Sequence, residues 1–170
     1  MEPETGSRDR GTGVRSKNSP GDIRHLDAGT IEKLASSATA LVLFDGLCNL
    51  CDSLVEFLLR HDRKNRLRFA ALQSEAAKRQ MQRHQVTPGR PDSLIVIESE
   101  RVYQKSSAVL RIVRHLPAPW RLLSIFEIVP QKLRDWIYDW IAKHRYRWFG
   151  RRASCRRPPQ NFQKKFIDFP

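Results

Sequence analysis

Apolar residues along the chain occur in two arrangements, short continuous runs and residues repeated at three- and four-residue spacing. The first run, ALVLF at 40–44, contains no polar residue, which predicts a strand that is buried on both faces. Asp45 and Gly46 end this run. Beyond them the spacing predicts a helix that begins near Cys48 and gathers these apolar side chains on one face: Leu50, Cys51, Leu54, Val55, Leu58 and Leu59.

The middle of the chain continues this alternation of strands and helices. We predict a strand over 67–72, a polar helix over 74–85 and a strand over 93–98. A hairpin turn at 99–100 then leads into a short return strand at 102–104. These segments give the order β-α-β-α-β-β, which is typical of an α/β domain with a mixed sheet.

Further helices are predicted toward the C-terminus. Ser106-Ser107 can cap a helix that ends before Pro117, which completes a β-α-β-α-β-β-α core. After Pro130 an amphipathic helix is predicted, and we expect it to pack onto the sheet domain with its apolar side. That side carries Leu133, Trp136, Ile137, Trp140, Ile141 and His144. We interpret the tryptophans as core or packing anchors: Trp120, Trp136, Trp140 and Trp148.

The composition fits one globular domain with polar ends. Of the 170 residues, 40% are hydrophobic and 29% are charged, which is ordinary for a globular protein. Residues 1–38 are rich in Gly, Ser, Arg and Asp, and we expect a flexible tail there. We assign 39–157 to the folded domain and 158–170 to a second polar tail.

The charge of the chain is large and uneven. The formal net charge is +13, and residues 130–170 hold eleven Lys or Arg against three Asp. No signal peptide is visible near the N-terminus, and acidic residues there argue against a transit peptide, so we expect a cytoplasmic protein. No apolar run approaches the roughly 20 residues that a membrane-spanning helix needs.

The chemistry of the chain is expected at a C-x-x-C pair, Cys48 and Cys51. Because the pair follows a buried strand and opens a helix, Cys48 meets unpaired backbone N–H groups and the positive end of the helix dipole, which lower a thiol pKa. Cys51 lies one turn further along the same face, where it can resolve a mixed disulfide. Asp45 can cap the helix, shuttle a proton or oppose ionisation of Cys48, and its net effect stays open.

The stretch 43–51, which contains Asp45-Gly46-Leu47-Cys48-Asn49-Leu50-Cys51, resembles the D-G-x-C-x-x-C signature of the DCC family, also called DUF393. Further similarity lies at Asp92-Ser93, 102–108, 128–130, Tyr138, 145–151 and Cys155. The resemblance implies a thioredoxin-like fold and a thiol–disulfide oxidoreductase without an organic cofactor. Its expected substrates are disulfide-containing proteins or small thiols, and an external reductant or oxidant would recycle the pair.

The same resemblance bears on three supporting positions. Thioredoxins place a cis-proline before the third core strand, facing the active cysteine, and here Pro91 stands one position early, so Asp92 is expected at the facing site. Gly46 belongs to the signature turn. Cys155 is singled out by the family pattern alone, as a structural thiol or a third redox partner.

Three other interpretations compete with the redox site. The cysteines could be buried core residues, or Cys48, Cys51 and Cys155 could bind zinc together with His144. The segment 143–157 holds seven Lys or Arg, no acid and three aromatic residues, as a surface for nucleic acid or an anionic membrane would. For this segment we favour a solvated basic face whose aromatic side chains pack inward.

Overall fold

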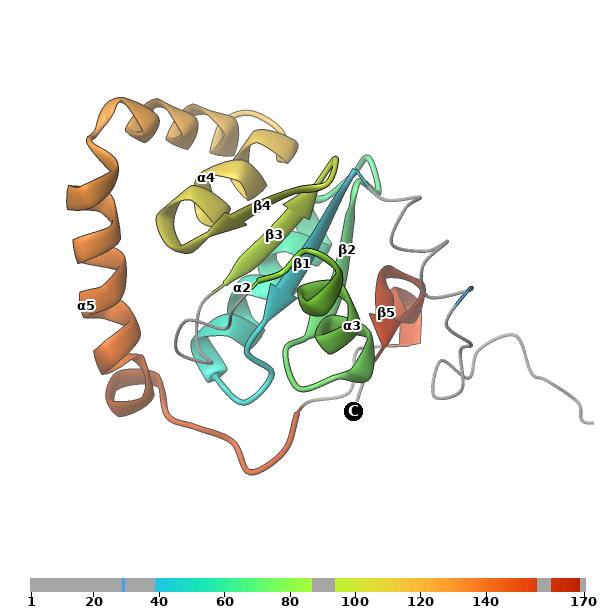
Figure 1. Cartoon of the computed structure of the whole chain (residues 1–170). Helices are drawn as coiled ribbons and strands as arrows, with labels where there is room; N and C mark the ends of the chain where they lie inside the picture. The colour runs from blue at the N-terminus through green and yellow to red at the C-terminus, as the bar shows by residue number, and fades with distance from the viewer. Residues whose placement is uncertain (1–28, 30–38, 87–93, 156–159, 169–170) are drawn as a thin grey trace, which may run out of the picture.

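The structure is a computed structural model that describes Gly29 and residues 39–86, 94–155 and 160–168 (Figure 1). Its first half contains β1 (Ala40–Phe44), α2 (Asn49–His61), β2 (Leu67–Ala71), α3 (Glu75–Arg83), β3 (Ile95–Glu98) and β4 (Arg101–Gln104). Its second half contains α4 (Lys105–His115), η2 (Trp120–Ile128), α5 (Gln131–Phe149), η3 (Gln160–Lys165) and β5 (Phe166–Asp168). The predicted β-α-β-α-β-β-α order is confirmed.

The sheet has the strand order β4-β3-β1-β2-β5. β1 and β2 are parallel, whereas β3 runs antiparallel to β1 and pairs with β4 through the predicted hairpin. Ser99 and Glu100 both adopt positive φ values at this turn, which suits the twist of a tight hairpin. The fold is therefore of the α/β class and thioredoxin-like, as predicted.

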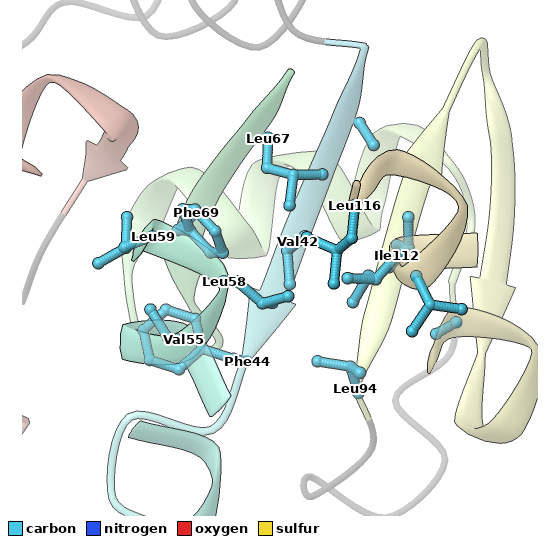
Figure 2. Close-up of a cluster of buried hydrophobic side chains, with 14 of the residues drawn as sticks. Val42, Phe44, Val55, Leu58, Leu59, Leu67, Phe69, Leu94, Ile112 and Leu116 are labelled. Atoms are coloured by element: carbon cyan, nitrogen blue, oxygen red, sulfur yellow. The ribbon is translucent and has the colours of Figure 1, made fainter. Parts of the chain in front are cut away.

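Helices cover both faces of the sheet, so each face has its own core. One core gathers alternate residues of β1, Val42 and Phe44 among them, with side chains of α2 and α4 (Figure 2). The other core gathers Leu41 and Leu43 with the alanines of α3. The five residues of β1 are all buried, which explains the uninterrupted apolar run of this strand.

The C-terminal segment differs from the polar tail that we predicted over 158–170. Residues 166–168 form β5, which pairs parallel to β2 at the edge of the sheet. Phe166 and Ile167 are buried, and Phe166 packs against Phe69 of β2. Two apolar residues among polar neighbours are too short a signal for a strand, and only the unpaired edge of β2 gives them a partner.

The orientation of α5 is also different from the prediction. This helix packs against α4 and α2 along one edge of the molecule (Figure 1), but it does so with its polar side. Tyr138 and Arg145 lie inward, while Leu133, Trp136 and Trp140 are exposed to solvent. The expectation of an inward apolar side was wrong, because the inward side of α5 carries Arg145, which pairs with the buried Asp45 carboxylate.

The four tryptophans are consequently not core residues. All of them are exposed on η2 and α5, with 37% of Trp120 and 66% of Trp136 accessible to solvent. Two of the three aromatic residues of the basic segment are also outward, since about half of Trp148 and Phe149 is exposed, whereas Tyr146 lies inward as expected. Within the described part of the chain, none of the helices is both long and apolar enough to span a bilayer.

Candidate functional site

The two cysteines lie where the sequence predicted, at the start of α2. Cys48 is the N-cap residue of this helix and has an extended backbone conformation, with φ −96° and ψ 121°. Cys51 lies one turn further, and the two residues are 3.7 Å apart. Neither thiol is engaged in a disulfide, and Cys48 is fully buried whereas Cys51 is partly exposed.

Several donors converge on the Cys48 sulfur and favour its ionised form. A hydrogen bond from the Cys51 side chain is the largest cause that lowers the pKa of Cys48 from 9.0 to about 6, although burial opposes it. The backbone N–H groups of Cys51 and Leu50 and the positive charge of Arg145 lower this pKa further. The same hydrogen bond, together with burial, raises the pKa of Cys51. These opposite pKa shifts favour the thiolate at Cys48 and the thiol at Cys51.

Asp45 is held rigidly in the turn between β1 and α2. Its Oδ1 accepts hydrogen bonds from the Leu47 N–H at 3.1 Å and from Gln73 Nε2 at 2.9 Å. Its Oδ2 accepts from Arg145 at 3.0 Å and from the Tyr146 hydroxyl. Only 2–3% of the Asp45 and Arg145 side chains is exposed, so their charges compensate one another away from water.

Arg145 connects this ion pair to the cysteines. One of its guanidinium nitrogens bonds Asp45, and the other lies 3.8 Å from Cys51 Sγ. A buried cation at this point compensates the Asp45 carboxylate and also lowers the pKa of Cys48. The neighbouring Tyr146 has a raised pKa, first because of burial and then because it donates to Asp45.

Gln73, Arg145 and Tyr146 were not recognised as site residues from the sequence. Gln73 lies in the loop between β2 and α3, and Arg145 and Tyr146 lie near the end of α5, about 100 residues from Asp45. Arg145 and Tyr146 belong to the stretch that resembles the DCC pattern, which was the one available signal. They were missed because they belong to the segment 143–157, which we interpreted as a solvated basic face.

Gly46 allows Cys155 to lie directly against the turn. A methyl group at Gly46 would come within 2.4 Å of Cys155 Sγ and within 3.3 Å of the Ala71 Cβ. Gln73 joins the same cluster, because its Oε1 accepts from the Gly46 N–H at 3.2 Å and lies 3.9 Å from Cys155 Sγ. Burial raises the pKa of Cys155, and the negative charges of Asp45 and Asp52 add to this effect.

A C-terminal segment, residues 150–155, covers the cysteine turn. Arg151 forms an isolated antiparallel bridge with Cys48, and the Arg152 N–H donates to the Leu47 carbonyl at 2.9 Å. The Arg152 side chain reaches α2, where it donates to Asn49 at 2.5 Å and pairs with Asp52 at 3.2 Å. We call residues 150–155 the cover, and their contacts with the turn contribute to the complete burial of Cys48.

A family profile described as DCC1-like thiol-disulfide oxidoreductase matches residues 42–151. The chain belongs to this family. It is 40% identical over 127 residues to the uncharacterized protein YuxK of Bacillus subtilis, an alignment that covers 75% of this chain and 93% of that protein. It is 42% identical over 116 residues to a chloroplastic DCC family protein of Arabidopsis thaliana, covering 68% of this chain and 67% of that protein. No solved structure matches the chain significantly.

Membership in the DCC1-like family confirms the resemblance seen in the sequence, and the family name points to disulfide or thiol substrates in general. The matched residues include both the cysteine turn and the Arg145–Tyr146 pair, whereas Cys155 lies just beyond them.

Two other predicted positions stand apart from this cluster. Asp92 lies outside the described residues. His144 is on α5 between Trp140 and Trp148, with its ring stacked on Trp148 at 5.3 Å. No three His, Cys, Asp or Glu side chains in the described ranges are grouped as metal ligands. The geometry therefore does not favour the zinc interpretation.

Proposed function

We propose that this DCC1-like protein exchanges thiols and disulfides through Cys48 and Cys51, with Cys48 as nucleophile and Cys51 as resolving thiol. The observation that carries the proposal is the hydrogen-bonded pair at the start of α2, in which the pKa of Cys48 is lowered to about 6 and that of Cys51 is raised. A pair so polarised has one thiolate ready to attack at neutral pH.

The exchange takes place in two displacements. The Cys48 thiolate attacks one sulfur of a substrate disulfide, forming a mixed disulfide and releasing one substrate thiolate. Cys51 then gives up its proton and attacks the Cys48 sulfur, which releases the second substrate thiolate. The products are the Cys48–Cys51 disulfide and the reduced substrate, so two electrons pass from the protein to the substrate, and an external dithiol must restore the pair.

Arg145 and Asp45 act as positioning residues in this scheme. During the second step Cys51 loses its hydrogen bond to Cys48. The Arg145 guanidinium, 3.8 Å from Cys51 Sγ, is then the nearest positive charge. A cation at that distance favours the Cys51 thiolate as it forms. Asp45 in turn fixes the guanidinium, and we assign Cys155 a structural role against Gly46.

The cover over the cysteine turn limits which disulfides can react. Because Cys48 is fully buried, a substrate disulfide reaches its sulfur only when the segment 150–155 moves away. We therefore expect Arg152→Ala, which removes two contacts to α2, to increase the rate of Cys48 alkylation by iodoacetamide. Arg63→Ala, an exposed arginine on the loop after α2, is the matched control and should leave the rate unchanged. Equal rates in both variants would show that access is not controlled by this cover.

The direction of the exchange depends on the compartment, which we propose to be the cytoplasm. A cytoplasmic protein would meet reduced thiol pools, which favours the reductase direction, with protein disulfides or small disulfides as substrates. Fractionation of cells that express the tagged chain tests the location, and a redox titration of the purified pair tests the direction.

Trapping of mixed disulfides tests the roles of the two cysteines. Cys51→Ser should accumulate adducts with a model disulfide, because Cys48 attacks and nothing resolves the product. Cys48→Ser should form none and lose reductase activity, and Cys155→Ala is the control that should keep it. Adducts of equal amount in Cys48→Ser and Cys51→Ser would contradict the proposed roles.

The pH dependence of alkylation tests the proposed thiolate. The rate at Cys48 follows the fraction ionised, so it should rise with pH to a plateau with a midpoint near 6 and not near 9.0. Cys51→Ala removes the largest stabilising hydrogen bond and should move the midpoint upward. A midpoint near 9.0 in the reduced wild-type protein would refute the activation of Cys48.

A further inference from the structure

The outer face of α5 is an apolar surface without a partner in the described structure. It consists of large side chains at helical spacing that are 37–66% exposed: Leu133, Trp136, Ile137, Trp140, Ile141 and Trp148. From Leu133 to Trp148 this stripe is about 22 Å long at the rise of an α-helix. Contiguous apolar surfaces of this kind are uncommon on proteins that do not use them for binding.

Aromatic contacts give the C-terminal half of this face a defined shape. Trp140 and Trp148 meet edge to face at 5.1 Å, and His144 stacks on Trp148 between them. Tryptophan is the residue that favours the boundary between lipid headgroups and acyl chains, because its ring is apolar and its N–H is polar. Exposed apolar residues of η2, Leu122 and Ile128 among them, adjoin the start of α5 through Val129-Pro130.

The cations and the acids of α5 have different surroundings. Lys132, Lys143 and Arg147 are exposed alongside the outer face. The acids of the helix are on the other side, where Asp139 pairs with Lys105 at 2.8 Å and Asp135 accepts a hydrogen bond from Ser106 of α4. The apolar stripe of α5 is therefore flanked by exposed cations, whereas both acids of the helix are engaged by side chains of α4.

We propose that the outer face of α5 docks the protein on an anionic membrane surface, with the helix lying flat and its tryptophans at the headgroup boundary. The apolar stripe supplies burial, and the flanking cations supply attraction to anionic lipids, which together are the features of interfacial helices. A second copy of this chain fits the surface less well, because a two-fold contact between identical faces would bring their cations together.

Binding to vesicles tests this proposal independently of redox activity. The full chain is floated with vesicles of phosphatidylcholine alone or mixed equally with phosphatidylglycerol, and tryptophan emission is recorded. We expect binding and a blue shift with the anionic vesicles. Trp136→Gln with Trp140→Gln should weaken binding by roughly tenfold or more, because the variant loses the apolar anchor.

Charge variants separate a specific docking face from general attraction of a basic protein. Lys132→Glu, Lys143→Glu and Arg147→Glu combined should weaken binding to anionic vesicles by roughly a hundredfold or more. The matched control combines Arg63→Glu, Lys64→Glu and Arg79→Glu, which change the net charge equally on α3 and the loop after α2, and it should keep most of the binding.

Three outcomes would overturn the proposal. The first is that the wild-type chain fails to bind anionic vesicles, which would leave a protein partner as the occupant. The second is that the control variant loses as much binding as the α5 charge variant, which would show nonspecific attraction. The third is a dimer in sedimentation equilibrium that Trp136→Gln with Trp140→Gln dissociates, which would identify a second copy of the chain as the occupant of this face.

Discussion

Helices α2 and α5 both carry an apolar stripe at helical spacing, yet they bury opposite sides. α2 packs Val55, Leu58 and Leu59 into the core, in agreement with its sequence pattern. α5 leaves its stripe in solvent and buries Arg145. An amphipathic pattern distinguishes the apolar side of a helix from its polar side, but the surface against which the helix packs determines which side is buried.

The surfaces that receive the two helices are different. α2 follows β1 directly and lies over the apolar side chains of the sheet. α5 meets the site end of the molecule, where the Asp45 carboxylate is buried and requires a positive partner. Arg145 and Tyr146 supply donors to it, so the polar side of α5 faces inward.

The strongest test of this explanation is Arg145→Met. Asp45 would remain as a buried, uncompensated carboxylate, and the free energy of unfolding should fall by about 3–5 kcal/mol. The pKa of Cys48 should also rise, since the Arg145 charge contributes to lowering it. Urea denaturation and the alkylation midpoint measure the two effects. Arg147→Met on the exposed side is the control, and an equal loss there would contradict the orientation of α5.

The same substitution on the two helices gives the next largest contrast. Leu58 of α2 is 1% exposed, and Leu133 of α5 is 50% exposed. Leu58→Ala should cost about 2–5 kcal/mol because it opens a cavity in the core. Leu133→Ala should change stability by less than about 0.5 kcal/mol, because it leaves no cavity. Thermal unfolding of both variants decides the matter, and comparable losses would mean that the stripe of α5 is buried.

A smaller effect is expected at the contact between the turn and the cover. Gly46→Ala places a methyl group against Cys155 Sγ and should destabilise the protein by about 1–3 kcal/mol through overpacking. Adding Cys155→Ala to this variant should recover part of the loss, because it removes the clashing sulfur. Urea denaturation of the two single variants and the double variant measures the coupling. Strict additivity would show that Gly46 and Cys155 are not in contact.

The smallest effect is expected for an exposed pair on the inner edge of α5. Lys105 and Asp139 are 36% and 45% exposed, so solvent screens their attraction. A double-mutant cycle with Lys105→Met and Asp139→Asn should give a coupling below about 1 kcal/mol. A coupling as large as the effect of Arg145→Met would mean that peripheral ion pairs hold α5 in place.

The sequence by itself determined the core of the fold and the position of the cysteines. The apolar run at 40–44, the Asp45-Gly46 turn and the helical spacing after Cys48 are local patterns, and their order along the chain predicts the α/β class. The helix start predicts a lowered pKa for Cys48 from backbone dipoles alone.

The tertiary structure decided everything that depends on distant partners. It brought Arg145 and Tyr146 to Asp45 across about 100 residues, placed Cys155 against Gly46 and added β5 to the edge of the sheet. It also turned the apolar stripe of α5 outward. Periodicity records which residues share a side of a helix, but only the assembled fold determines whether that side meets apolar side chains, a buried carboxylate or solvent.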